Sequence, residues 1–201
     1  MKKDLTILMN LRRLNNIQRC MTFPVARPET VASHSCFVGM LCSVVGRDYN
    51  STYGDTVDMG ILLEKALFHD SEEAYISDIP WNVKHFNNEV HDCIENVISS
   101  KLNAIFKDCS FVTDLQKVIK ECKSGIEGTI VNLCDMIELG FYCYDELNMG
   151  NNNMLLLGIK AINIIKGYDE KLLALESVSS IVEELDNKFS TIENHSYIDI
   201  N

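Results

Sequence analysis

The sequence predicts an all-α fold, a single multi-helix bundle, and three observations lead to this prediction. Apolar residues recur at three- and four-residue steps along most of the chain, which is the period of an amphipathic helix. No alternation of apolar and polar residues is long enough to indicate a strand, and no internal repeat is present. The 201 residues include only 3 prolines and 10 glycines, so few positions force a break.

The break signals place the helices in order. Thr30 can cap a helix that follows a loop containing Pro24 and Pro28, while Pro80 and Gly125 mark later breaks. The polar stretch 46–55 is expected to be a loop. The helices are expected over about residues 3–18, 30–45, 57–76, 83–97, 111–122, 126–147, 155–166 and 172–189.

Length and composition fit one domain, and the net charge limits the classes of partner. The hydrophobic content of 46% is enough for a core, and we expect the domain to cover residues 1–189, followed by a polar, flexible tail over 190–201. The net charge of −11 argues against a nucleic-acid polymer as partner, because a phosphate backbone requires a basic surface. A small phosphorylated ligand stays compatible, since a few local cations suffice to bind it.

The cysteines and the apolar runs indicate a reducing, cytoplasmic location. No C-x-x-C motif occurs among the 8 cysteines. The basic residues at the start are not followed by a sustained apolar region, so they make a poor signal peptide. No stretch approaches the roughly 20 apolar residues of a membrane span, so no membrane partner is expected. Five cysteines fall in apolar, helix-like stretches, as buried thiols do: Cys36, Cys42, Cys93, Cys122 and Cys134.

The segment H-D-S-E-E-A-Y-I-S-D-I-P, residues 69–80, gives the main functional signal. His69 and Asp70 offer an imidazole nitrogen and a carboxylate oxygen, which both suit a small divalent cation. Glu73 would stand one turn further along the same face of a helix, and Asp78 lies where that helix ends. A His-Asp pair alone means little, but the apolar run before this one should pull it toward the interior. The pattern predicts a hydrolytic metal site.

His34 and Asp135 are the candidates that would complete this site. Taken alone, His34 is better interpreted as a polar surface residue or a hydrogen-bonded core histidine, because histidine is usually only partly buried. Asp135 lies in L-C-D-M-I, where a charge is costly unless it is paired or bound to a metal. The alternative for Asp135 is the exposed side of an amphipathic helix, and Glu138, three residues later, favours that alternative.

The order H…HD…D on separate helices of an all-α chain resembles the HD-domain metal-dependent phosphohydrolases. Two segments extend the resemblance: R-C-M-T-F-P-V-A-R-P-E-T-V-A-S-H-S at residues 19–35 and H-D-S-E-E-A-Y-I-S-D-I-P-W-N-V-K at residues 69–84. They are similar to the bacterial 5′-deoxynucleotidases of that superfamily and to their phage-encoded deoxynucleotide-hydrolysing relatives. The similarity covers about residues 1–150 in order and spacing.

The resemblance implies an HD-type phosphohydrolase domain with a divalent metal bound by His34, His69, Asp70 and Asp135. Two imidazoles and two carboxylates form a mixed nitrogen and oxygen set, which suits manganese, cobalt, zinc or iron. Magnesium is a further candidate, and the sequence does not decide among these metals. A metal in this set would acidify a water and polarise the phosphorus centre of a substrate.

The resemblance also implies roles for residues around the metal. Glu73 activates or orients the attacking water, Arg19 holds the phosphate, and Asp78 contacts the sugar or the leaving group. The guanidinium of Arg19 offers a fork of donors that matches phosphate oxygens. Lys84 and Arg27 are further candidates for a local basic rim, with solvated surface positions as the alternative.

Cys20 is the one departure from the family pattern that affects the predicted substrate. The family commonly has a tryptophan directly after the arginine, where it packs by the sugar and helps to reject a ribose 2′-hydroxyl. The smaller Cys20 suggests room for a ribose at this point, unless another bulky residue fills it. Trp81 and Phe23 are the candidates, and packing at the start of the next helix is the alternative for Trp81.

The sequence is compatible with three functions. The first is a phosphohydrolase that acts on deoxynucleoside 5′-monophosphates. The second is a triphosphohydrolase that removes triphosphate from a deoxynucleotide such as dATP, as some phage relatives do. The third is a non-catalytic metal-binding protein, against which the presence of Glu73 and Arg19 argues. A homodimer or higher homo-oligomer is plausible, because the expected helices at 155–189 are rich in apolar residues, although a core would explain these equally well.

Overall fold

The computed structural model describes residues 9–84, 86–106 and 113–198, and the part it describes is helical. Within these ranges no strand occurs, only an isolated bridge between Gln18 and Thr30. The prediction of an all-α fold is therefore confirmed. The elements are η1 (Arg12–Asn16), α2 (Val31–Tyr53), α3 (Met59–Phe68), α4 (Glu73–Ile76), α5 (Trp81–Lys84), α6 (Asn88–Phe106), α7 (Thr113–Lys120), α8 (Gly125–Asn148), η3 (Asn152–Met154), α9 (Leu155–Ile165), α10 (Glu170–Leu173) and α11 (Glu176–Ile198).

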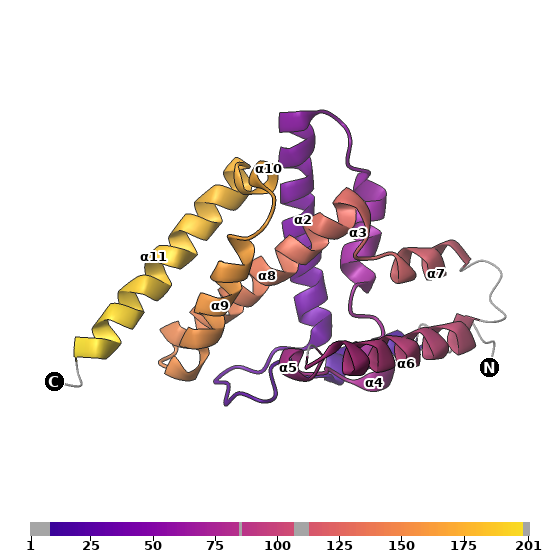
Figure 1. Cartoon of the computed structure of the whole chain (residues 1–201), viewed down its shortest axis with the longest axis horizontal. Coiled ribbons are helices and arrows are strands. Elements are labelled where there is room, and N and C mark those ends of the chain that lie inside the picture. Colours follow the sequence, from indigo (N-terminus) through magenta and orange to yellow (C-terminus); the bar gives the residue numbers. More distant parts are fainter. Residues whose placement is uncertain (1–8, 85, 107–112, 199–201) are drawn as a thin grey trace.

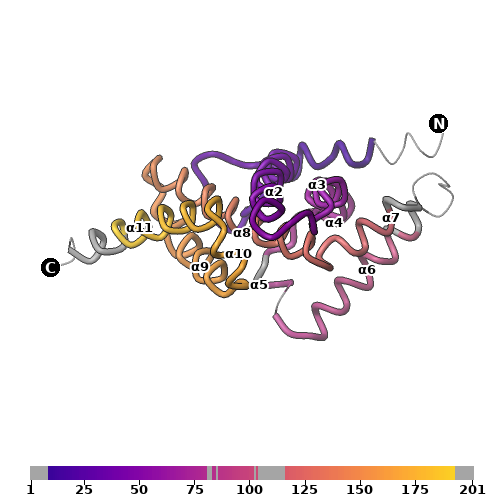
Figure 2. The backbone as a smooth tube through the Cα atoms, turned by 90° about the horizontal axis from the view of Figure 1, so that it is seen from above, coloured from indigo at the N-terminus to yellow at the C-terminus, as the bar shows by residue number. Residues whose placement is uncertain are grey.

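Two long helices, α2 and α8, form the centre of the molecule. Figure 1 shows α8 crossing α2, with α9 to α11 on one side and α4, α6 and α7 on the other, and the view from above in Figure 2 agrees. Both helices pack against α3, and α8 also packs against α9. The main core lies between these elements, with Val38, Leu62, Ile130, Ile137 and Ile162 almost completely buried.

The expected loop at 46–55 was wrong, because α2 continues as a helix through Tyr53. Gly46 suggested a break, but it lies in the helix where α3 comes close. A Cβ atom at Gly46 would lie 2.5 Å from Cδ2 of Leu62, so the glycine permits the packing of two helices. The helix ends at Gly54, whose φ of +89° is a conformation that favours glycine.

The continuous helix expected over 57–76 was also wrong. Helix α3 ends at Phe68, and a turn separates it from the short helix α4, which begins at Glu73. Within the turn, the amide of Glu73 donates to the carbonyl oxygen of Asp70 at 3.1 Å. Asp70 and Ser71 favour such a turn, because their side chains compete with helical backbone hydrogen bonds. The His-Asp pair therefore lies at a helix end rather than within a helix.

Other helix boundaries differ from the sequence prediction as well. The helix expected over 83–97 is divided into α5 and α6, and α6 continues to Phe106. The chain is helical through Ile198, where a polar tail was expected from residue 190. Polar residues are compatible with an exposed helix, so apolar periodicity marks such ends poorly. No helix in the described ranges combines the length and apolar character needed to cross a membrane.

A buried carboxylate fixes the loop between η1 and α2 against α8. Glu146 is completely buried, and its two oxygens accept hydrogen bonds from the amides of Ala26 at 2.6 Å and Arg27 at 2.7 Å. The side-chain amide of Asn151 donates to the same carboxylate at 2.6 Å. Burial opposes ionisation, but these hydrogen bonds outweigh it and lower the pKa of Glu146. The loop is thereby held in one position relative to the helix bundle.

We expect Gly128→Ala to destabilise the protein and Gly39→Ala to leave it at least as stable. A Cβ at Gly128 would lie 2.3 Å from the backbone carbon of Lys123, which cannot move aside like a side-chain end. At Gly39 the nearest atom would be Cδ2 of Leu67 at 3.8 Å, an ordinary contact, and alanine favours the helix. The expected cost at Gly128 is about 1 to 3 kcal/mol.

Thermal unfolding followed by circular dichroism checks this expectation. A melting temperature lowered by at least about 2 °C for the Gly128 variant corresponds to about 1 kcal/mol in a chain of this size. Equal melting temperatures for the two variants would contradict the close backbone approach at Gly128.

Candidate active site

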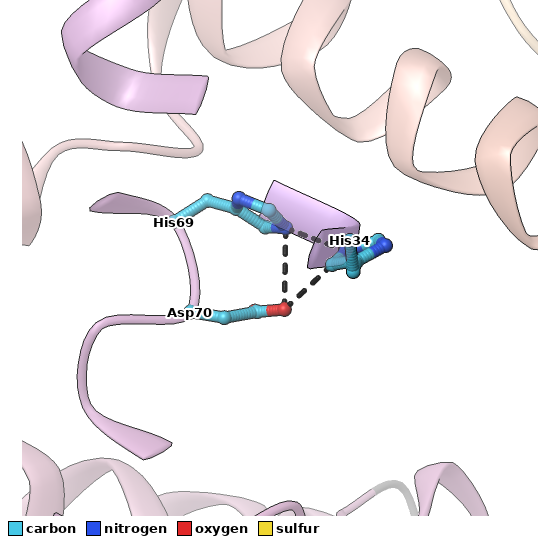
Figure 3. A group of neighbouring side chains, drawn as sticks. All are labelled: His34, His69 and Asp70. Atoms are coloured by element: carbon cyan, nitrogen blue, oxygen red, sulfur yellow. Dashed lines mark hydrogen bonds and ion pairs between the residues drawn. The ribbon is translucent and has the colours of Figure 1, made fainter. Parts of the chain in front are cut away.

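Four side chains from three helices converge on one point. His34 lies on α2, His69 and Asp70 follow α3, and Asp135 lies on α8; Figure 3 shows the first three pointing toward one another. Nε2 of His34 lies 3.1 Å from Nε2 of His69 and 3.2 Å from Oδ1 of Asp135. Oδ2 of Asp70 lies 3.2 Å from Nε2 of His69 and 3.6 Å from Nε2 of His34. Atoms that share one metal ion at about 2.1 Å lie roughly 3 to 3.5 Å apart, so this spacing fits a metal centre.

Each histidine is oriented by an acceptor at its other ring nitrogen. Nδ1 of His69 lies 2.8 Å from the carbonyl oxygen of Ala66, and Nδ1 of His34 lies 2.6 Å from Oε2 of Glu138. With the proton on Nδ1 in both rings, each Nε2 presents a lone pair to the shared point. Histidines that bind metals are held in this way, by a carboxylate or a backbone carbonyl on the far nitrogen.

The charges around this point also fit a cation. Oδ1 of Asp135 is buried and, among the described residues, has no hydrogen-bond partner. Burial opposes ionisation of Asp70, but His69 outweighs it and holds the pKa of this carboxyl well below its usual range. Conversely, burial disfavours a charged His69, but Asp70 outweighs it and raises its pKa to about 10. The carboxylates thus favour positive charge among them, which a divalent cation supplies with both imidazoles neutral.

Glu73 is the first residue of α4 and directly follows the turn that carries His69 and Asp70. Burial raises the pKa of Glu73 to about 9, and the charges of Asp70, Asp78 and Glu72 add to this effect. Its Oε2 is buried without a hydrogen-bond partner among the described residues. A cation near Asp70 would lower this pKa. An unpartnered carboxylate in such a position can accept a proton, which is what a general base requires.

Arg19 reaches the metal-ligand group from the loop before α2. Its Nη1 donates to Oε2 of Glu29 at 3.2 Å and to Oε2 of Glu138 at 2.8 Å, and it also contacts Nδ1 of His34. Its Nη2 lies 3.7 Å from Oδ1 of Asp135. The guanidinium is mostly buried, with 13% of the side chain exposed. A planar donor group next to the candidate metal ligands can bind the oxygens of a phosphate.

Asp78 fixes the backbone next to Arg19. Its Oδ2 accepts a hydrogen bond from the amide of Cys20 at 3.2 Å. Cys20 has a φ of +55°, and Ser77, directly before Asp78, has a φ of +66°. Both values lie in the left-handed region, which is strained for residues other than glycine and is often found at functional sites. Asp78 therefore orients the Arg19 loop, besides any contact that it makes with a substrate.

The remaining predicted contacts are only partly described. Lys84 is half-buried at the end of α5. Burial raises the pKa of Glu72, and the nearby charge of Lys84 partly offsets this effect. The side chain of Trp81 lies outside the described residues. Phe23 is half-buried and packs against the main core, which favours a packing role for it.

Two acidic residues of the site were missed by the sequence analysis. Glu138 was interpreted as support for an exposed helix face, yet it is 3% exposed and contacts both His34 and Arg19. Glu29 was not considered, although it lies between the arginine and histidine of the same motif. Burial raises the pKa of Glu29 to about 7, and the charge of Glu138 adds to this effect. The available signal was the spacing of Asp135 and Glu138, which places both on one helix face in an apolar segment.

Comparisons with known proteins identify the family of this chain. Residues 6–189 match the family described as 5′-deoxynucleotidase YfbR-like. A 5′-deoxynucleotidase of Klebsiella pneumoniae is 30% identical over 169 residues, which are 82% of this chain and 80% of that protein. The 5′-deoxynucleotidase YfbR of Escherichia coli is 28% identical over 155 residues, which are 73% of this chain and 75% of that protein.

Solved structures of HD-domain phosphohydrolases have a fold similar to that of this chain. An HD-domain phosphohydrolase from Listeria innocua is similar with a TM-score of 0.70 and 25% identity, over 92% of this chain and 97% of that one. The cyanophage S-2L HD phosphohydrolase DatZ, bound to dA and one catalytic Zn²⁺ ion, has a TM-score of 0.57 and 15% identity, over 91% of this chain and 96% of that one. Because the family match extends over nearly the whole sequence, the chain belongs to the YfbR-like 5′-deoxynucleotidase family.

Proposed function

We propose that this protein is a metal-dependent hydrolase that releases orthophosphate from deoxynucleoside 5′-monophosphates. The observation that carries the proposal is the convergence of four candidate ligand atoms next to an arginine, together with a glutamate whose Oε2 is buried and has no hydrogen-bond partner in the described part of the chain. Membership of the family supports the reaction class, and the names of the relatives support the monophosphate substrate.

In the proposed site, His34, His69, Asp70 and Asp135 hold the metal. A divalent cation there supplies Lewis acidity, which makes water more acidic and a phosphoryl oxygen more polarised. Zinc, manganese, cobalt and magnesium all stay candidates. The two-imidazole, two-carboxylate set favours the transition metals over magnesium, which prefers oxygen ligands and retains several waters.

The residues around the metal divide the remaining tasks. Arg19 binds the phosphate and neutralises part of its charge, and Glu73 accepts the proton of the attacking water. The new bond joins the water oxygen to phosphorus, and the bond from phosphorus to the 5′-oxygen breaks. We infer that Asp78, whose pKa is raised by burial, contacts the sugar or gives a proton to the leaving 5′-oxygen. Lys84 and Trp81 stay candidate substrate contacts.

The proposal also includes the extent of the catalytic domain, the cellular location and the oligomeric state. We infer one catalytic domain that ends near residue 189, where the family match ends. A cytoplasmic location is supported by seven described cysteines that are free thiols. Ile162 and Ile165 of α9 and Phe189 of α11 are buried in the chain's own core, whereas Leu156 of α9 is 77% exposed. The buried residues give no support to a homo-oligomer, which stays a prediction to be tested by its mass in solution.

Product analysis is the primary test of the proposed function. With added manganese, cobalt, zinc or magnesium, we expect deoxynucleoside and orthophosphate from deoxynucleoside 5′-monophosphates, and no product after chelation of the metal. Asp70→Ala should be inactive, because it removes a ligand from the metal centre. Release of tripolyphosphate from deoxynucleoside triphosphates would contradict the proposal and show that the protein is a triphosphohydrolase. The absence of any metal-dependent product, with wild type and the Asp70 variant alike, would leave a binding protein.

Glu73→Gln should separate catalysis from metal binding. We expect kcat to fall about 10²- to 10⁴-fold, because the side chain can no longer accept a proton. The metal content after dialysis should stay that of the wild type, since Glu73 is not among the four converging ligands. Glu64→Gln, at an exposed position on α3, is the matched control and should be fully active. Unchanged phosphate release by the Glu73 variant would remove this residue from the mechanism.

Cys20→Trp should increase the preference for deoxyribose. A larger side chain next to Arg19 would fill the space that a ribose 2′-hydroxyl needs, so we expect the kcat/KM ratio of dAMP to AMP to rise about tenfold. Met21→Trp, at the exposed neighbouring position, is the matched control and should keep the wild-type ratio. If wild type and the Cys20 variant reject AMP equally, the sugar selectivity lies elsewhere.

A further inference from the structure

The guanidinium of Arg19 is anchored through one nitrogen by two carboxylates. Nη1 donates to Glu29 at 3.2 Å and to Glu138 at 2.8 Å, and these residues belong to the loop before α2 and to α8. The backbone is fixed at the same place, since the amide of Arg19 donates to the carbonyl oxygen of Glu29 at 2.9 Å. Arg19 is therefore held at its main chain and at its tip by the same residue.

This anchoring determines which donors face the metal centre. A guanidinium is planar and has five N–H donors, two of them on Nη1. Glu29 and Glu138 occupy the Nη1 donors, and planarity then fixes the direction of Nη2. Nη2 is the atom that approaches Oδ1 of Asp135, at 3.7 Å. The edge of the arginine that carries Nη2 is thus directed toward the candidate metal ligands, where a phosphate would lie.

Glu138 orients a metal ligand with the same oxygen that holds the arginine. Its Oε2 accepts from Nη1 of Arg19 and lies 2.6 Å from Nδ1 of His34. The side chain is 4% exposed, so water has little access to this oxygen. Glu29, by contrast, forms an ion pair with Arg19 at 3.2 Å, and its carboxylate lies within 4.8 Å of a ring nitrogen of His34. Glu138 thus connects the arginine to a candidate metal ligand, while Glu29 forms its ion pair with the arginine.

We propose that Glu29 and Glu138 are positioning residues, Glu29 for phosphate binding by Arg19 and Glu138 for both phosphate binding and metal binding by His34. The inference rests on the proposed function, in which Arg19 binds phosphate and His34 binds the metal. It predicts that the two glutamates have different effects on two separate binding constants. A role limited to stability would change neither constant in the folded, metal-loaded protein.

The test uses Glu29→Gln and Glu138→Gln, which keep the side-chain size and remove the charge. Metal affinity is measured by titrating the metal-free protein with Zn²⁺ or Mn²⁺, and phosphate affinity by calorimetry of orthophosphate with the metal-loaded protein. For Glu29→Gln we expect orthophosphate binding to weaken about tenfold, with metal affinity within about twofold of wild type. For Glu138→Gln we expect both to weaken, metal affinity by about 10- to 100-fold.

Enzyme kinetics give an independent measurement of whether Glu29 affects phosphate binding without affecting metal binding. For Glu29→Gln we expect the KM for a deoxynucleoside monophosphate to rise about tenfold while kcat changes less, because a binding contact loses its orientation. In an Arg19→Lys background the Glu29 substitution should have no further effect on KM or on orthophosphate binding, since lysine has no planar fork to orient. Independent effects of the two substitutions would overturn the role of Glu29.

Glu127→Gln is the matched control. It lies on α8 like Glu138, but its carboxylate accepts a hydrogen bond from the amide of Asp58 at 3.1 Å. All binding constants of this variant should equal those of wild type. Wild-type orthophosphate affinity in Glu29→Gln, or loss of metal affinity alone in Glu138→Gln, would overturn the proposal. If Glu138→Gln does not fold, the Glu29 variants carry the test.

The binding measurements also separate this proposal from the proposed function. If wild type hydrolyses no deoxynucleotide but binds metal and orthophosphate, the substrate assignment fails while the roles of the two glutamates are still tested by calorimetry. If wild type hydrolyses deoxynucleotides and the Glu29 and Glu138 variants keep both affinities, only the positioning proposal fails.

Discussion

Concentrated negative charge between α2, α3 and α8 is the constraint on which the rest of the site depends. Asp70, Asp135 and Glu138 place their carboxylates within a few ångströms of His34, in surroundings from which water is largely excluded. Carboxylates in such a place are costly unless positive charge neutralises them. Arg19 supplies one positive charge, and a bound divalent cation would supply the rest. An affinity for a cation would therefore be a consequence of how these three helices pack.

The fold class and the position of the His-Asp pair in the candidate site could be predicted from the sequence because their signals are local. Helical periodicity is visible in any window of the chain, and His69 and Asp70 are adjacent residues behind an apolar run. His34 and Asp135 were ambiguous when taken singly. Only their combination with the His-Asp pair, in the order typical of the family, favoured the ligand interpretation over a surface position.

Features that depend on contacts between distant segments could not be predicted in this way. Gly46 indicates a break in the sequence, but its role is to admit Leu62 of another helix, so the helix continues. Glu138 illustrates the same limit for the site. Its spacing from Asp135 shows that the two share a helix face, but not whether that face is turned to solvent or to a partner. The partner is an arginine 119 residues away in the chain.

The loop before α2 carries Arg19, and contacts from several parts of the chain hold it in place. Glu146 binds its far end, Asp78 binds the amide of Cys20, and Glu29 pairs with Arg19. Cys20 adopts a left-handed conformation that costs of order 1 to 3 kcal/mol, and such a conformation persists only where the surroundings fix it. The contacts on either side of Cys20 provide that restraint. A rigid loop would keep the arginine aligned with the candidate metal centre, which other segments build, so that the proposed phosphate binding would require little reorganisation.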